Sequence, residues 1–169
     1  MGQGKMAANE SKLTLEVLSK LILNGIGLKD TIDSINALLK IKNRNDMFTT
    51  LDLCNINLAN ARMKLIKYGA NPSYHIRSGM VEKIATNSLP VGVVSKLKMV
   101  SYEMPLKNND LIIMSSDGTG NDFEQIVNDN VHLYCDQHPQ EIATFLMDQV
   151  LEKNNLDDIS IIVIKVVNN

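Results

Sequence analysis

The chain has 169 residues, of which 44% are hydrophobic and 21% charged, as expected for one globular domain with a substantial core. Its formal net charge of −2 gives no indication of binding to nucleic acid or to an anionic membrane. No apolar run approaches the ~20 residues that span a bilayer, and the N-terminus has no signal-peptide core, so a cytoplasmic location is expected. Two cysteines without a CxxC pair and three dispersed histidines argue against a disulfide framework and a zinc cluster.

The first part of the chain is predicted to form two helices. Leu15, Leu18 and Ile22 repeat with a helical period within residues 6–24. A second apolar stripe of the same period occupies residues 28–41. Such stripes usually pack into a core, so we expect a helix hairpin lying on a sheet.

From Phe48 onward the pattern changes to short strands separated by turns. The predicted strands span residues 48–58, 62–68, 74–77, 80–84, 99–104 and 111–114, with a last strand from Ile159. A short helix is expected after Asp122, whose side chain is predicted to cap it, and a longer helix is expected to begin at Pro139. Because helices precede strands that follow one another as hairpins, the order predicts antiparallel sheets covered by helix pairs.

Two of these strands lie next to acidic residues. The apolar run from Leu111 ends at Asp117 and Gly118, and Asp157 and Asp158 immediately precede the last apolar run. Gly118 is expected to supply backbone angles that a side chain forbids. If the two strands are neighbours, these acids come together, and adjacent carboxylates repel each other unless they are protonated or bound to a cation. The sequence therefore suggests a divalent-metal site.

Several segments resemble, in order and spacing, the phosphatase domains of the stage II sporulation protein E family. This family belongs to the metal-dependent protein phosphatases (PPM, or type 2C). Each motif is weak alone, but their order and strand context are fairly specific. The similar segments are Met1–Gly4 with Glu10-Ser11, Phe48–Leu53, Gly69–Ser73, Leu89–Gly92, Ser116–Gly118 and Asp157–Ser160.

The resemblance implies an α/β (α+β) fold of the PPM type, an α-β-β-α sandwich of antiparallel sheets flanked by helix pairs. It also implies two manganese or magnesium ions that activate a water for attack on a phosphoryl group. By this resemblance, Asp117 and Asp157 are the catalytic metal ligands. Asp158 stands where relatives often have Asn, so Asp158 and Gly118 are expected to support the ligands without binding metal.

The sequence departs from the family pattern at its start. The first family motif begins with Asp-Gly, and this chain begins at the Met that would follow it. We therefore expect residues 1–169 to form a single PPM-type domain that lacks its first strands and one metal-ligand aspartate. Missing strands leave an open sheet edge, which favours pairing with another chain, so a dimer is expected.

The sequence leaves three hypotheses for the function. The first is a metal-dependent serine/threonine protein phosphatase that dephosphorylates an anti-anti-sigma factor in sporulation control, as the resemblance implies. The second is a non-catalytic or truncated phosphatase-like binding module. The third, a phosphotransferase with an aspartyl nucleophile, is weak, because such folds place the nucleophile after an early parallel strand. Neither a nucleic-acid partner nor a membrane segment is expected.

Overall fold

The computed structural model describes residues 5–42, 48–134, 136–153 and 158–167. The chain forms two compact units. One comprises Met1–Leu53, Ile66–Ala70 and Thr86–Ser101, and the other comprises Cys54–Leu65, Asn71–Ala85 and Tyr102–Asn169. No helix in these described ranges is long and apolar enough to cross a membrane.

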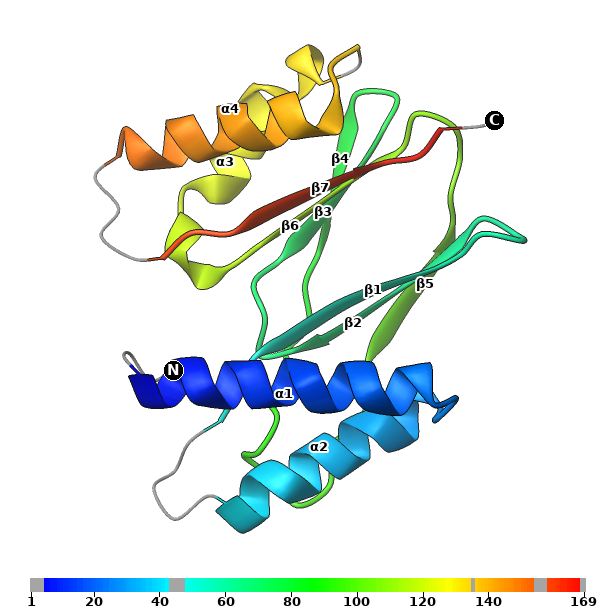
Figure 1. Ribbon diagram of the computed structural model, residues 1–169. Helices are drawn as coiled ribbons and strands as arrows, with labels where there is room; N and C mark the ends of the chain where they lie inside the picture. Colours follow the sequence, from blue (N-terminus) through cyan, green and yellow to red (C-terminus); the bar gives the residue numbers. More distant parts are fainter. Residues whose placement is uncertain (1–4, 43–47, 135, 154–157, 168–169) are drawn as a thin grey trace. The chain divides into compact units, whose positions relative to one another are not determined.

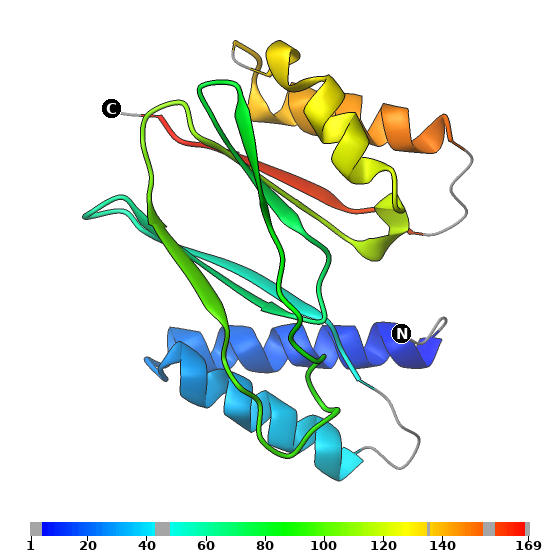
Figure 2. The same ribbon diagram turned by 180° about the vertical axis from the view of Figure 1, so that it is seen from behind.

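The first unit contains the predicted helix hairpin. Helix α1 spans Lys5–Leu23 and α2 spans Leu28–Lys42, and the two lie side by side (Figures 1 and 2). The apolar stripes pack on the adjoining strand segments and on the loop after residue 86. The buried members of this cluster are Ile32, Ile35, Leu39, Leu51, Ile66, Tyr68 and Val91.

A buried asparagine fixes the loop of the first unit to α2. The Nδ2 of Asn36 donates a hydrogen bond to the carbonyl oxygen of Val94 at 3.0 Å, and its Oδ1 accepts one from the backbone N–H of Gly92 at 2.8 Å. The asparagine thus satisfies two backbone groups of a loop whose Val91 also forms a β-bridge with Thr49, as buried polar groups require.

A three-stranded sheet has the order β1-β2-β5, with β1 at Leu51–Asn57, β2 at Arg62–Tyr68 and β5 at Ser101–Pro105. Strand β2 contributes to both units, because its alternating side chains enter different cores. Ile66 and Tyr68 belong to the cluster of the first unit. Met63 and Leu65 belong to a cluster of the second unit, which they share with Ile112.

The second unit is built on a four-stranded antiparallel sheet of order β4-β3-β6-β7. These strands span Ser73–Arg77 (β3), Met80–Ile84 (β4), Leu111–Ser115 (β6) and Ile161–Lys165 (β7). Helices α3 (Phe123–Asp129) and α4 (Pro139–Leu151) cover one face of this sheet (Figure 1). Short 3-10 turns lie at Asp117–Thr119 and Val131–Leu133.

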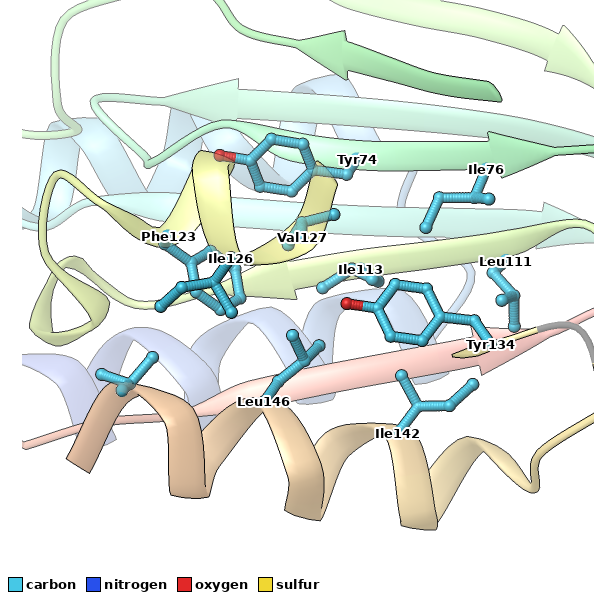
Figure 3. Close-up of a cluster of buried hydrophobic side chains, with 11 residues drawn as sticks. Tyr74, Ile76, Leu111, Ile113, Phe123, Ile126, Val127, Tyr134, Ile142 and Leu146 are labelled. Atoms are coloured by element: carbon cyan, nitrogen blue, oxygen red, sulfur yellow. The ribbon is translucent and has the colours of Figure 1, made fainter. Parts of the chain in front are cut away.

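The core under α3 and α4 is made by alternate residues of the strands and the inner faces of both helices. Tyr74, Ile113, Tyr134 and Leu146 are among its buried members (Figure 3). Helix α4 begins at the predicted Pro139, and His138 and Glu141 form a reciprocal capping box around its first turn. The predicted capping role of Asp122 is wrong, because Asp122 occupies the N-cap position of α3 without a side-chain cap hydrogen bond. Its carboxylate lies 3.4 Å from Lys153 Nζ.

Candidate functional site

The predicted neighbourhood of the two acid-bearing strands is confirmed. Strands β6 and β7 pair antiparallel, with Leu111 opposite Lys165 and Ser115 opposite Ile161. The pairing continues one step further, because the N–H of Ser116 donates to the carbonyl oxygen of Ser160 at 3.0 Å. The N–H of Ser160 in turn donates to the Ser116 hydroxyl oxygen at 2.9 Å. The end of β6 therefore lies against the start of β7, where the acidic residues stand in the sequence.

Gly118 permits this close approach, for a reason that differs from the predicted one. Its φ does not fall in the left-handed region, where Gly120 of the same loop lies with φ 76°. The constraint is space: a Cβ at position 118 would lie 2.9 Å from the carbonyl carbon of Asp158 and closer still to its oxygen. A side chain there would push the two segments apart.

Hydrogen bonds to backbone carbonyl oxygens fix the turn that carries Asp117. The carbonyl oxygen of Ser116 accepts hydrogen bonds from Asn71 Nδ2 and from Thr119 Oγ1, each at 3.0 Å. Gly120 N–H donates to the carbonyl oxygen of Asp117 at 3.1 Å and closes the turn. Sequence reasoning placed Asn71 within the family-like loop Gly69–Ser73 and assigned it no contact. Its contact with residue 116 joins distant parts of the chain, which local pattern does not reveal.

The predicted site residues are placed as follows. Asp117 and Asp158 are exposed at the ends of the two neighbouring segments, and Gly118 is buried between them. Asp157 lies outside the described residues. Carboxylate oxygens presented on two touching segments are donors that a hard divalent cation prefers. Within the described ranges, no group of three or more His, Cys, Asp or Glu side chains is arranged to hold a metal ion.

A second polar cluster lies at the opposite end of β6. The Asp110 side chain is 1% exposed. Arg77 donates two hydrogen bonds to it, from Nε to Oδ1 at 2.8 Å and from Nη2 to Oδ2 at 2.5 Å. The N–H of Lys107 also donates to Oδ2 at 2.8 Å, and His75 Nε2 lies 3.2 Å from the same atom. Burial raises the pKa of Asp110, but the Arg77, Lys107 and His75 contacts outweigh burial and lower the pKa to about 2.

The first unit holds a buried ion pair. Lys67 Nζ on β2 lies 2.5 Å from Asp52 Oδ2 on β1, and the two side chains are 1% and 17% exposed. Neither this pair nor the Asp110 cluster was predicted from the sequence. Their members are spread over separate strands and a turn, and only the strand pairing brings them together.

Comparison with known proteins decides the family. A family model described as stage II sporulation protein E matches residues 1–167. The chain belongs to this family. It is 32% identical over 178 residues to stage II sporulation protein E of Bacillus subtilis (strain 168) and 33% identical over 178 residues to that of Priestia megaterium. These alignments cover all of this chain but only 22% and 30% of the relatives, so the chain spans less than a third of their length.

Solved structures confirm the predicted fold. The chain is 30% identical, with a TM-score of 0.85, to a structure of the PP2C phosphatase domain and a fragment of the regulatory domain of the Bacillus subtilis protein, covering 98% of this chain and 52% of that one. A PPM Ser-Thr phosphatase from Mycobacterium smegmatis, solved with cacodylate, is 17% identical with a TM-score of 0.77 over 97% of this chain and 84% of that one. The latter likeness shows the fold alone. The α+β class of the PPM type is therefore established.

Proposed function

We propose that this chain is a metal-dependent protein phosphatase domain that removes phosphate from a phosphoserine or phosphothreonine of a protein substrate. The observation that carries the proposal is the junction of β6 and β7. There, Asp117 stands on a turn braced by Asn71 and Thr119 and packed through Gly118 against Asp158. Membership of the stage II sporulation protein E family supports this role.

In this proposal, Asp117 and Asp157 hold manganese or magnesium. Bound metal would neutralise phosphoryl charge and lower the pKa of a water for in-line attack. A structure of the Bacillus subtilis phosphatase domain is described as manganese-presoaked, which supports a divalent-metal requirement. The chain's own contribution is position: the Ser116 carbonyl, fixed by two donors, sets the direction of the turn that presents Asp117. Asp158 supplies a backbone surface against which that turn rests.

The substrate proposed is a phosphorylated anti-anti-sigma-type protein, and the process is sporulation control. Family membership supports the process, since the matching relatives are sporulation proteins. The cytoplasmic location expected from the sequence stays a prediction.

The test is manganese-dependent release of phosphate from a serine-phosphorylated anti-anti-sigma protein. Two polypeptides are compared. One is residues 1–169, and the other is the same chain with a strand ending in Asp-Gly fused ahead of Met1. We expect turnover in the fused chain, abolished by EDTA and restored by Mn²⁺, and it is compared with turnover by residues 1–169 alone. If the fused chain is folded and binds the substrate without turnover under any metal, the binding-module alternative replaces the phosphatase.

A further inference from the structure

A cavity of about 170 Å³ opens beside the turn that carries Asp117, and nothing in the proposed chemistry uses it. Ser115, Thr119 and Gly120, which flank that turn, form one of its walls. Sites for whole drug-sized ligands measure about 300–1,000 Å³. This cavity therefore has room for one side chain next to the candidate metal edge.

Two aromatic residues line the cavity among mostly polar ones. Tyr74 and Phe123 line it and also belong to the core beneath α3 and α4, with ring centroids 5.9 Å apart in an edge-to-face arrangement. Figure 3 shows both rings at the same end of this core, away from Tyr134 and Ile142. Burial, followed by the charge of Glu124, raises the pKa of Tyr74 to about 12, so its hydroxyl stays protonated at neutral pH. Both rings are buried in the core beneath α3 and α4, which fixes their place at the cavity.

Neutral hydrogen-bonding groups also line the cavity. Asn71 and Asn121 contribute amides, and Ser115 and Thr119 contribute hydroxyls. Such groups both donate and accept hydrogen bonds.

Among the residues that the structure describes, the charged ones lining the cavity are Lys83 and Glu124, and they pair with each other. Lys83 Nζ on β4 donates to Glu124 Oε2 on α3, and both side chains are partly exposed, at 44% and 42%. A guest side chain with a charge of either sign would meet one like and one opposite charge, so the pair would give it little net attraction to offset the loss of its hydration. An unpaired charge is also costly to desolvate.

We infer that this cavity is a specificity subsite that takes an uncharged, hydrogen-bonding side chain, such as Gln, Asn, Ser or Thr, from a substrate residue flanking the phosphorylated one. The inference rests on the proposed phosphatase function, because it places the phosphorylated residue at Asp117. The Lys83–Glu124 pair sets the preference for a neutral guest by cancelling charge at the cavity.

The inference is tested by releasing one charge at a time. Glu124→Gln leaves Lys83 without its carboxylate, and Lys83→Met leaves Glu124 without its ammonium. Glu103→Gln breaks the Lys64–Glu103 pair, a similar surface ion pair (2.8 Å) that does not line the cavity, and serves as the matched control. Serine-phosphorylated peptides that carry Gln, Glu or Lys at each position flanking the phosphoserine are mixed as competing substrates. The enzyme is the full chain preceded by the Asp-Gly strand, and the reaction contains Mn²⁺.

Within each variant, the ratio of kcat/KM between peptides is read, so that changes in absolute activity cancel. At one flanking position, we expect the unmodified chain to prefer Gln. Glu124→Gln should shift the ratio towards Glu, and Lys83→Met towards Lys, by roughly threefold to fivefold, as for a partly exposed ion pair. Glu103→Gln should keep the preference for Gln. Ratios that are the same in all four proteins overturn the inference.

A second measurement does not need turnover. Acetamide, acetate and methylammonium are titrated separately into residues 1–169 and into the two cavity variants of this chain. The NMR amide signals of Asn71, Thr119 and Asn121 are followed. Acetamide should shift these signals most in the unmodified chain, acetate in Glu124→Gln and methylammonium in Lys83→Met. If no peptide is hydrolysed but these shifts appear, the cavity still selects neutral guests, and the phosphatase proposal fails together with the substrate role of the subsite. If peptides are hydrolysed, but neither the NMR shifts nor the changes in the kcat/KM ratio appear, only the subsite fails.

Discussion

Gly118 lies so close to the backbone of Asp158 that a Cβ on residue 118 would be 2.9 Å from the Asp158 carbonyl carbon. This approach joins the turn bearing Asp117 to the segment that leads into β7. Two hydrogen bonds between Ser116 and Ser160 continue the same junction. The position of Asp117 therefore depends on the absence of a side chain at the next residue.

Gly118→Ala is expected to separate these segments. The added methyl group must displace backbone, and overpacking of this kind costs about 1–3 kcal/mol. Urea unfolding should show that loss of stability, and the amide of Ser160 should exchange faster with solvent. Gly27→Ala is the control, because a Cβ there meets nothing closer than Asp30 Oδ2 at 3.8 Å. An unchanged Ser160 exchange rate in Gly118→Ala would contradict the described junction.

The buried Lys67–Asp52 pair predicts a strong coupling between β1 and β2. Removing one partner of a buried ion pair costs about 3–5 kcal/mol, and less where, as for Asp52 at 17% exposure, one group keeps contact with water. Lys67→Met and Asp52→Leu should each lower the urea midpoint clearly, and the double variant should recover most of the loss. A double-mutant cycle with additive effects would show that the two side chains act independently.

Asp110 predicts an acid-sensitive element of stability. Its pKa is about 2 in the folded chain, below the ordinary value near 3.8. A lowered pKa stabilises the folded state above about pH 4, and this contribution is lost as the pH falls towards 2. At 1.36 kcal/mol per pKa unit, the loss is about 2 kcal/mol.

Asp110→Asn should remove this contribution. Urea midpoints measured from pH 5 to pH 2 should then fall less steeply than those of the unmodified chain, and the midpoint at pH 7 should be lower. Asp148→Asn, which changes an exposed carboxylate on α4, should keep the original slope. Parallel curves for Asp110→Asn and the unmodified chain would show that the Arg77 and His75 contacts do not stabilise the charged carboxylate.

Strand β7 predicts self-association. It is the last strand of its sheet within the described residues, and Ile162 on it is 56% exposed. Edge strands with apolar exposed residues pair with other chains unless a charge blocks them. Sedimentation velocity should show concentration-dependent dimers that Ile162→Lys weakens, whereas Asp148→Lys at an exposed position of α4 should leave them unchanged. A monomer at all concentrations would contradict the expected dimer.

Local pattern was sufficient to predict most of the fold. Strand β2 was predicted at its observed bounds, because Met63, Leu65, Ile66 and Tyr68 alternate, and Pro139 marked the start of α4. The run from Leu111 ended where the sheet ends, so the acid at position 117 could be located in advance. The role of Asp122 was misjudged because its backbone is helical (φ −83°, ψ −4°), whereas a capping residue usually has an extended backbone that brings its side chain over the first turn.

The supports of the site could not be predicted in the same way. Asn71 reaches the Ser116 carbonyl from a turn 45 residues away in sequence. The space constraint at Gly118 arises from residue 158, 40 positions later in the chain. Both depend on the pairing of β3, β6 and β7, which sequence pattern suggests but does not specify in register. The resemblance to a known family supplied the candidate ligands, whereas the contacts that orient them required the structure.

Manganese binding by Asp117→Asn tests the central claim most directly. Isothermal titration with Mn²⁺ compares three versions of the chain preceded by the Asp-Gly strand: unmodified, Asp117→Asn and Asp122→Asn. Asp122 is the matched control, because it lies five residues further along the same loop and contacts Lys153. We expect Asp117→Asn to weaken Mn²⁺ binding by more than the roughly 10–100-fold typical of losing a supporting residue, and Asp122→Asn to leave it unchanged. Equal Mn²⁺ affinity in all three proteins would contradict the assignment of Asp117 as a metal ligand.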